Sequence, residues 1–352
     1  MSAFRIEGTR GALVESRHAV SAAVVDAGGR LLAHAGDADL ITFWRSAAKP
    51  FQALPLLVDG AVDRFGLGSE ELALACASHS SEPPHLAVAR RFLERIGCRE
   101  SDLACGPHPP LGPAVADEVI RRGITMTPSW SNCSGKHAGM LALARHHGWP
   151  TGGYERTGHP VQERILREVS AWTGLDSASL ALAVDGCTAA CFGLPLRAMA
   201  LAYARFAADP GAAATRLRGA MAAHPGLVAG TGRFDSDVIR ASGGRILAKI
   251  GAEGVYGACV VPLGLGVAVK VEDGDMRSAP AALAAILLEL LQRAPEDDFG
   301  EVRGVLERSA RTGIRNTRGE LTGELAPAGD LQYSAPARGA AAGAPGGMER
   351  HS

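Results

Sequence analysis

The sequence predicts an α+β fold in which both ends of the chain build one antiparallel sheet and the middle adds a mostly helical insertion. Two patterns predict it. Short apolar runs separated by glycines occur near the start of the chain and again past residue 234, as in neighbouring antiparallel strands. Between them, segments of helical periodicity alternate with loops rich in Gly, Pro and Ser.

From the N-terminus, the first predicted element is a hairpin within residues 18–35 that turns at Ala27-Gly28-Gly29. An apolar helical stretch then runs to Leu57, and Pro50 fits only in its first turn, which would place Ser46 at the helix N-terminus. Leu180–Val184 is predicted as a short buried strand. Further predicted helices are Pro84–Ile96, Pro113–Arg122, Gly135–His147, Val161–Trp172 and Leu194–Phe206, and the later elements are strands Arg245–Ile250, Val255–Pro262 and Val267–Glu272 with a covering helix Ala281–Arg293.

Chain length allows one large domain. With 352 residues, 47% of them hydrophobic, the chain can bury a sizeable core. We expect residues 1–327 to form a single domain of two closely packed lobes. Residues 328–352 are rich in Gly, Ala and Pro, and we expect a disordered tail there.

Charge and hydropathy exclude some partners. Lys and Arg total 36 against 37 acidic residues, so the chain has no excess of positive charge that would attract nucleic acid. The longest apolar run, Ala279–Leu291, is interrupted by Glu289 and is too short for a bilayer, so we expect no membrane partner. The first residues lack a basic region followed by an apolar stretch, which favours a cytoplasmic protein. The seven cysteines are expected to be mostly free thiols.

The first motif that could carry chemistry is Ser46-Ala47-Ala48-Lys49. Residues three apart lie on the same side of a helix, so a buried Lys49 could take the proton of Ser46 and make it a nucleophile. The backbone N–H of Ser46 could bind a developing oxyanion. Penicillin-binding proteins and class A β-lactamases use this arrangement. Four-residue patterns are common, and the alternative is an N-cap serine beside a surface lysine.

Two polar segments follow. Ser78 lies in a cluster of serines and a histidine after an apolar helical stretch, and this cluster is either a polar turn or the source of a second catalytic hydroxyl. The loop from Trp130 to Met140 is typical of a segment that approaches a ligand. Its Gly135-Lys136 suggests a phosphate loop, but Trp130 stands where that motif needs glycine, so nucleotide binding is excluded.

Cys133 and Cys187 lack C-x-x-C partners, and spacing alone does not predict a zinc finger. Two thiols and a nitrogen could still complete an open zinc site with water. Lys270 lies in an apolar strand, where it must pair, extend its amine to solvent or act as a base; an edge-strand charge that protects the sheet is the alternative.

Seven blocks together resemble the asparaginase II family, the rhizobial-type (class 3) L-asparaginases. They run in order from Arg45 to Gly274, and similar sequence extends from about residue 10 to about 325. The blocks are Arg45-Ser46-x-x-Lys49-Pro50, Ala77-Ser78-His79-Ser80, the highly specific Asn132-Cys133-Ser134-Gly135-Lys136-His137-Ala138-Gly139-Met140, Asp185-Gly186-Cys187, Gly232-Arg233-Phe234-Asp235, Lys249-Ile250-Gly251-Ala252-Glu253-Gly254 and Gly264-x-Gly266-x-Ala268-x-Lys270.

The resemblance implies a fold similar to serine β-lactamases and penicillin-binding proteins, working as a homodimer. It also implies two Ser-Lys tandems, which fall on Ser46 with Lys49 and on Ser78 with Lys270. We expect the pKa of Lys270 to be lowered by burial and neighbouring positive charge, so that its neutral amine can act as a base.

A zinc ion is also implied, held by Cys133, Lys136 and Cys187 with water, and acting to position the substrate. Because only a neutral lysine has a lone pair, metal affinity should fall in acid. Three further positions match family residues near the substrate: Arg45, His137 and Asp185.

Two features depart from the expected pattern. Cys191 adds a sulfur near Cys187 that could compete for metal or form a disulfide. No K-T-G follows Lys270, which argues against antibiotic or peptidoglycan hydrolysis.

The leading hypothesis is therefore hydrolysis of L-asparagine to L-aspartate and ammonia, with Ser46 as the nucleophile that forms an acyl-enzyme. A serine peptidase or esterase of the penicillin-recognising type is one alternative. A non-catalytic zinc or amino-acid sensor is the other.

Overall fold

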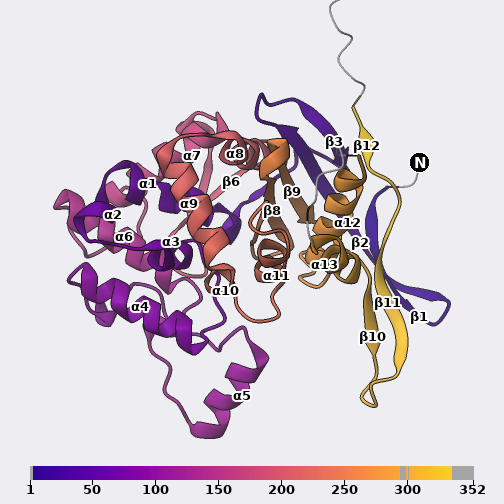
Figure 1. The fold of residues 1–352 in the computed structure, drawn as a ribbon, viewed down its shortest axis with the longest axis horizontal. Helices are drawn as coiled ribbons and strands as arrows, with labels where there is room; N and C mark the ends of the chain where they lie inside the picture. The colour runs from indigo at the N-terminus through magenta and orange to yellow at the C-terminus, as the bar shows by residue number, and fades with distance from the viewer. Residues whose placement is uncertain (1–2, 294–298, 300, 335–352) are drawn as a thin grey trace, which may run out of the picture.

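The computed structural model describes residues 3–293, 299 and 301–334. Strands from both ends of the chain form one antiparallel sheet, whose main path runs β10-β11-β1-β2-β9-β8-β7; β3 branches from β2, and β12 pairs with β3 (Figure 1). This confirms the predicted α+β class and the predicted hairpin, whose arms are β2 and β3. The strands are β1 (Arg5–Arg10), β2 (Leu13–Asp26), β3 (Leu31–Ala35), β7 (Ile246–Ile250), β8 (Val255–Val260), β9 (Leu265–Val271), β10 (Thr312–Arg315), β11 (Leu321–Ala328) and β12 (Gln332–Tyr333).

The sheet is the middle layer of the molecule because successive residues of its strands face opposite sides. On β2, Ala23 and Val25 pack into the core of the helical insertion. Val20, Ala22 and Val24 pack instead against α12 (Ser278–Arg293), the predicted covering helix. Among the described residues, each face of the sheet therefore packs against its own large hydrophobic core, and a third, smaller cluster lies within the helical insertion.

Helices of the insertion cover one face of the sheet, and α12 and α13 cover the other (Figure 1). The predicted helices are all present, with ends shifted by a few residues. The helices are α1 (Lys49–Val58), α2 (Ala61–Arg64), α3 (Ser69–Ala75), α4 (Pro83–Arg95), α5 (Pro113–Arg122), α6 (Ser134–His147), α7 (Pro160–Thr173), α8 (Leu196–Ala208), α9 (Ala212–Ala223), α10 (Pro225–Val228), α11 (Phe234–Ala241), α12 and α13 (Val302–Ala310).

Glycines allow α8 to pack closely on the sheet. A Cβ on Gly266 of β9 would collide with the backbone of Ala200 and Ala204, and one on Gly257 of β8 would collide with the ring of Tyr203. The helix axis therefore approaches β8 and β9 more closely than a side chain would permit.

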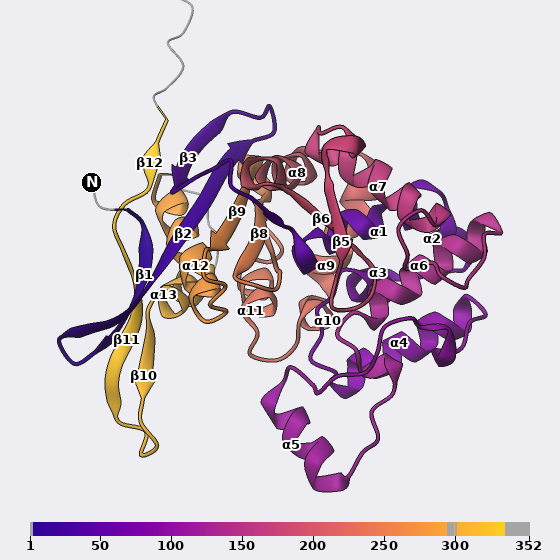
Figure 2. The same ribbon diagram turned by 180° about the vertical axis from the view of Figure 1, so that it is seen from behind.

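A second sheet, β4-β6-β5, lies on the helical lobe, and Figure 2 shows β5 and β6 on the near side of that lobe. Its strands are β4 (Ile41–Phe43), β5 (Ala181–Val184) and β6 (Ala190–Pro195). The prediction that Leu180–Val184 is a buried strand was wrong about burial: β5 is an edge strand, and its Val184 is 76% exposed. An apolar run of five residues cannot by itself distinguish an edge strand from a central one.

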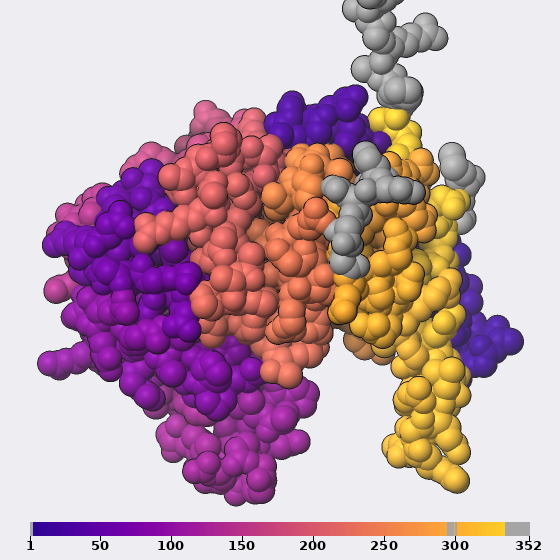
Figure 3. All heavy atoms as spheres, viewed as in Figure 1, coloured from indigo at the N-terminus to yellow at the C-terminus, as the bar shows by residue number. Residues whose placement is uncertain are grey.

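Two parts of the structure project from the same side of the molecule, the segment around α5 and the ribbon of β10 and β11, and the surface is hollowed between them (Figure 3). Ordered structure also extends past residue 328, where the tail was predicted to begin: Leu331 is buried and β12 pairs with β3. The rest of the predicted tail, 335–352, lies outside the described residues. No helix among the described residues is long and apolar enough to cross a membrane.

Candidate functional site

Ser46 and Lys49 lie where the chain turns from β4 into α1. A single 3-10 turn, Arg45–Ala48, leads directly into the helix, with Pro50 in its first turn as predicted. The turn is anchored because Trp44 N–H donates to the Phe192 carbonyl and Tyr203 O–H donates to the Ala47 carbonyl. Ser46 is half-buried, whereas Lys49 is only 1% exposed, so the lysine is not the surface residue of the alternative interpretation.

Arg45 adopts a backbone conformation that non-glycine residues rarely use, with φ at +53°. Such a residue persists only where its surroundings hold it, and functional sites are where such strain gathers. Here the guanidinium donates through Nε and Nη2 to Asp185 Oδ1, at 3.0 and 2.9 Å. The pKa of Asp185 is below its ordinary value despite burial, because Lys136 and Arg45 both favour the carboxylate.

Ser78 is the meeting point of two buried lysines. It follows α3, and its N–H donates to the Val228 carbonyl. Lys49 Nζ lies 3.1 Å from Ser78 Oγ and also donates to the Ala77 carbonyl. Lys249 Nζ, from the end of β7, lies 2.7 Å from the same Oγ and donates to the Ile250 carbonyl at 2.8 Å. Ser78 is thus a buried hydroxyl held between two amines rather than part of a solvent-facing polar turn.

The pKa of Lys249 suits a base that accepts a proton near neutral pH. It is fully buried, and burial is the main reason that its pKa falls to about 7. Positive charge on Lys49 and Arg233 lowers the pKa further, while Asp235 opposes the shift. A perturbed lysine within hydrogen-bond distance of a buried hydroxyl is a functional-site candidate.

The prediction that Lys270 pairs with Ser78 was wrong, because the second lysine beside Ser78 is Lys249. Lys270 Nζ donates to the carbonyls of Glu253 and Val271, and Lys249 takes the place beside Ser78. Burial does lower the pKa of Lys270, as expected, but the expected positive neighbours were wrong: the groups that act on it are Glu253, Asp273 and Glu272, which raise its pKa. The edge-strand alternative was wrong too, because β9 pairs with β2 on one side and β8 on the other.

The register of β7, β8 and β9 explains why Lys270 was predicted in place of Lys249. Lys249 pairs with Gly257 and Gly257 with Ala268, so Lys249, Ala268 and Lys270 lie on the same face of the sheet. Lys270 is two strands away and two residues farther along, roughly 11–12 Å between Cα atoms. The signal that could have found Lys249 was a lysine within an equally apolar predicted strand, but choosing between the two required the strand order.

Cys133, Lys136 and Cys187 come together as the resemblance implied. Lys136 Nζ lies 2.9 Å from Cys187 Sγ. Gly135 lets the start of α6 approach α3, because a Cβ there would collide with the Leu74 carbonyl. The loop that carries Cys133 is therefore fixed against the helix that leads to Ser78.

The electrostatics of this group suit a metal ligand set. A hydrogen bond from the Cys133 thiol, followed by the charge of Lys136, lowers the pKa of Cys187 to about 4. The same hydrogen bond, with burial, raises the pKa of Cys133 to about 12. Burial opposes the charge of Lys136, but the two cysteines and Asp185 raise its pKa above the ordinary value. A preformed thiolate, a second thiol and an amine are donors that zinc accepts once the metal displaces their protons.

Other residues do not extend the donor set. Among the described residues, no group of three or more His, Cys, Asp or Glu side chains is placed to hold a metal; the expected set has only two such residues and a lysine. All seven cysteines are free, so Cys191 on β6 forms no disulfide with Cys187.

His137 is buried beside this group. Its Nδ1 lies 2.7 Å from the Tyr154 hydroxyl, which accepts a hydrogen bond from the Ala104 N–H. Burial, followed by the charge of Lys136, lowers the pKa of His137 to about 3, so the imidazole is neutral. Its Nε2 is buried without a hydrogen-bond partner among the described residues.

A cavity of about 400 Å³ connects these groups. Its walls include Ser46, Arg45, Asp185, Cys133 and Cys187. This volume lies at the small end of the range for ligand pockets. Ser46, the ion pair of Arg45 with Asp185 and the two cysteines therefore all line one small cavity.

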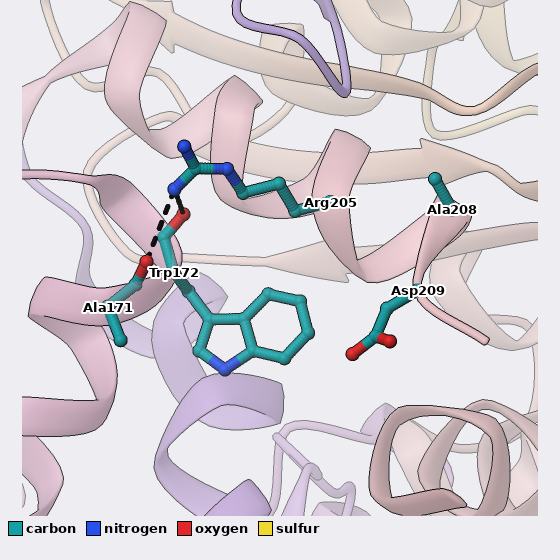
Figure 4. Close-up of a pocket in the computed structure, with 5 residues that line it drawn as sticks. All are labelled: Ala171, Trp172, Arg205, Ala208 and Asp209. Atoms are coloured by element: carbon teal, nitrogen blue, oxygen red, sulfur yellow. Dashed lines mark hydrogen bonds between the residues drawn. The ribbon is translucent and has the colours of Figure 1, made fainter. Parts of the chain in front are cut away.

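A second, larger hollow shares no wall with this site. It lies between α7 and α8, measures about 600 Å³ and is lined by Trp172, Arg205 and Asp209, among others. Figure 4 shows why its arginine is committed elsewhere: Arg205 Nη1 donates to the carbonyls of Ala171 and Trp172 at the end of α7. Arg205 thus serves the end of α7, and Asp209 Oδ1 accepts from Gly211 N–H, so the cavity beside Ser46 is the candidate site.

Comparison with solved structures finds relatives of low identity. A β-lactamase from Mycobacterium bovis is 15% identical, with a TM-score of 0.41 over 77% of this chain and 94% of that one. A putative β-lactamase from Bacteroides dorei DSM 17855 is 15% identical, with a TM-score of 0.36 over 72% of this chain and 88% of that one. Both TM-scores are under 0.5, so the fold class follows from the chain's own sheet topology.

Sequence comparison is more decisive. A search of curated proteins finds no match. The model of the L-asparaginase II family matches residues 6–327, which contain every motif block from Arg45 to Gly274 as well as the new pair of Ser78 and Lys249. The chain belongs to the L-asparaginase II family.

Proposed function

We propose that this chain hydrolyses the side-chain amide of L-asparagine to L-aspartate and ammonia. Family membership supports an amidohydrolase acting on a small molecule. The observation that carries the proposal is the Ser78 hydroxyl held between Lys49 and Lys249, directly behind the turn that presents Ser46 to a small cavity. Paired hydroxyls and amines of this kind suit the activation of a nucleophile and the protonation of a leaving amine.

The substrate's charges match the cavity. Asparagine carries an α-carboxylate and an α-ammonium group, and the cavity offers the Arg45 guanidinium and the Asp185 carboxylate side by side. Arg45 would bind the α-carboxylate and Asp185 the α-ammonium group. The side-chain amide would then point away from this pair, towards Ser46.

In the chemical step, Ser46 Oγ attacks the side-chain carbonyl carbon of asparagine while its proton passes to Lys49. Backbone N–H groups of the Arg45–Ala48 turn stabilise the oxyanion. The tetrahedral intermediate collapses, the carbon–nitrogen bond breaks, and the nitrogen takes a proton to leave as ammonia. Water then attacks the aspartyl ester, returns a proton to Ser46 and releases aspartate. Ser46 is the proposed nucleophile because it lines the cavity, whereas Ser78 is 3% exposed.

Ser78 and Lys249 would move the protons. With Lys249 neutral, Ser78 O–H can donate to Lys249 Nζ while Ser78 Oγ accepts from Lys49 Nζ. A proton taken from Ser46 by Lys49 can thus pass to Lys249 and return for the departing ammonia.

Zinc is the proposed cofactor, held by Cys133, Lys136 and Cys187. When bound, it would supply a Lewis-acidic centre in the cavity wall that fixes the substrate's position. The chain's own part is to bring two sulfurs and an amine together behind Arg45 and Asp185. A homodimer is proposed as well, and light scattering on the purified protein tests it.

Ammonia release tests the function. Purified protein, loaded with zinc, is incubated with L-asparagine, L-glutamine and a chromogenic β-lactam, beside the Ser46→Ala variant. The proposal requires ammonia from asparagine that the variant does not release. Lactam turnover without ammonia would select the penicillin-recognising peptidase or esterase, and asparagine binding without turnover would select the sensor.

A further inference from the structure

Asp235 is a buried carboxylate that the proposed chemistry does not use. It lies in the first turn of α11 and is 0% exposed. Its Oδ1 accepts a hydrogen bond from Ile250 N–H at 2.6 Å, and its Oδ2 accepts one from the Tyr256 hydroxyl at 3.0 Å. No salt bridge reaches it within the described part of the chain. A carboxylate removed from water in this way destabilises the fold unless hydrogen bonds and a nearby positive charge compensate.

Lys249 supplies the positive charge that compensates the buried Asp235 carboxylate. Ile250 donates its N–H to Asp235, and its carbonyl accepts from Lys249 Nζ, so one peptide residue holds both side chains. α11 packs against β7, the strand that carries Lys249. The carboxylate therefore fixes the strand end from which Lys249 reaches Ser78.

The groups that face Lys249 come from several elements. Asp235 and Arg233 belong to the start of α11, and Lys49 to α1. The Cys133 and Cys76 thiols are also close enough to interact with its charge. Burial raises the pKa of Cys76 to about 12, so this thiol is uncharged near neutral pH. Of the groups that raise the pKa of Lys249, Asp235 has the largest effect.

We propose that Asp235 is a positioning residue for Lys249: it holds the end of β7 and supplies the negative charge that keeps the amine able to accept a proton. This inference rests on the proposed amidohydrolase function. Burial, Lys49 and Arg233 all push Lys249 towards its neutral form. Without Asp235, the amine would be neutral over a wider range of pH but a weaker base, and so a poorer acceptor for the Ser78 proton.

The test replaces the charge and keeps the shape. Asp235→Asn retains an oxygen for Ile250 N–H, and the Tyr256 hydroxyl can reorient towards the amide. The acid limb of kcat/KM against pH reports the free enzyme's essential base. In this variant the limb should move to lower pH by roughly one to two units, the size of the effect of a full charge roughly 6–12 Å away in a medium of effective dielectric constant about 20.

Tyr256→Phe is the matched control, since it removes one hydrogen bond to Asp235 and no charge. Its limb should stay at the wild-type pH. Asp235→Glu, which keeps the charge and displaces the strand, should also keep the limb while kcat falls. An Asp235→Asn enzyme with an unmoved limb and a uniform loss of kcat would show that the carboxylate is only structural, and would overturn the proposal.

A measurement on the wild-type protein covers the case in which Asp235→Asn does not fold. Carbon-13 NMR of labelled carboxyl and lysine groups follows Asp235 and Lys249 with pH, with Lys249→Arg used to assign the lysine. Asp235 must be ionised throughout the range in which Lys249 titrates, and a protonated Asp235 at neutral pH would overturn the inference. Because this titration needs no turnover, a wild-type enzyme that releases no ammonia would defeat the proposed function alone.

Discussion

Replacing Lys249 with methionine should abolish turnover and stabilise the protein. The side chain is fully buried, and its pKa falls from 10.5 to about 7 chiefly because burial disfavours the charge. The folded state therefore binds fewer protons than the unfolded chain between about pH 7 and 10.5. The resulting penalty is complete below pH 7 and disappears as the pH rises towards 10.5.

The size of the penalty follows from that difference. A fall of about 3.5 pH units in pKa corresponds to about 5 kcal/mol of lost stability below pH 7. Methionine removes this penalty but also removes hydrogen bonds to Ser78 and to the Ile250 carbonyl, which costs about 1 kcal/mol each. The net gain should be about 3 kcal/mol in mildly acidic buffer and should vanish near about pH 9, where the remaining penalty equals the loss of the two hydrogen bonds; by about pH 10 the variant should be slightly less stable than the wild type.

Urea unfolding of the wild type and Lys249→Met, repeated from about pH 6 to about pH 10, measures this difference directly. Lys249→Arg is the control, since an arginine cannot lose its proton and should be both inactive and less stable than the wild type. A Lys249→Met protein destabilised equally at every pH would refute the reasoning, because it would show that the buried amine contributes ordinary packing and no charge penalty.

The remaining predictions concern the other groups of the site. Ser46→Ala and Lys49→Ala should each remove most activity, and the double variant should be scarcely worse than either, since they act as one unit; additive losses in kcat/KM would rule out that coupling. Cys133→Ser and Cys187→Ser should each lose zinc by elemental analysis and raise KM for asparagine more than they lower kcat, whereas full zinc in both variants would exclude this ligand set. Lys270→Met should keep wild-type turnover and pH profile, because its amine bonds to carbonyls of Glu253 and Val271; lost turnover in a folded variant would restore it to the mechanism.

Local patterns predicted the parts of the site that depend on a few neighbouring residues. The place of Ser46 just before a helix followed from one proline, and Ser46 lies in the turn that leads into α1. The amine of Lys49 bonds to Ser78 and to the Ala77 carbonyl. The loop of Cys133 and Lys136 was visible as a polar segment before a helix, and the structure brings it to Cys187. These features need only helix geometry or a highly specific motif.

Long-range register could not be predicted from the same information. Lys249 and Lys270 both lie in short apolar strands on the same face of the sheet, and only the order β9-β8-β7 decides which of them reaches Ser78. The exposure of β5 and the pairing of β12 with β3 depend likewise on which strand lies at an edge. Strand order arises from packing of the whole chain, which no window of sequence contains.

The central claim is that Ser46 attacks the asparagine amide, and trapping the acyl-enzyme tests it most directly. The zinc-loaded wild type is mixed with L-asparagine, quenched in acid within its first turnovers and digested, and the peptides are weighed by mass spectrometry. We predict one added aspartyl group on the peptide that carries Ser46, absent from Ser46→Ala. An aspartyl group on the peptide that carries Ser78, or ammonia release by Ser46→Ala at the wild-type rate, would contradict the proposed mechanism.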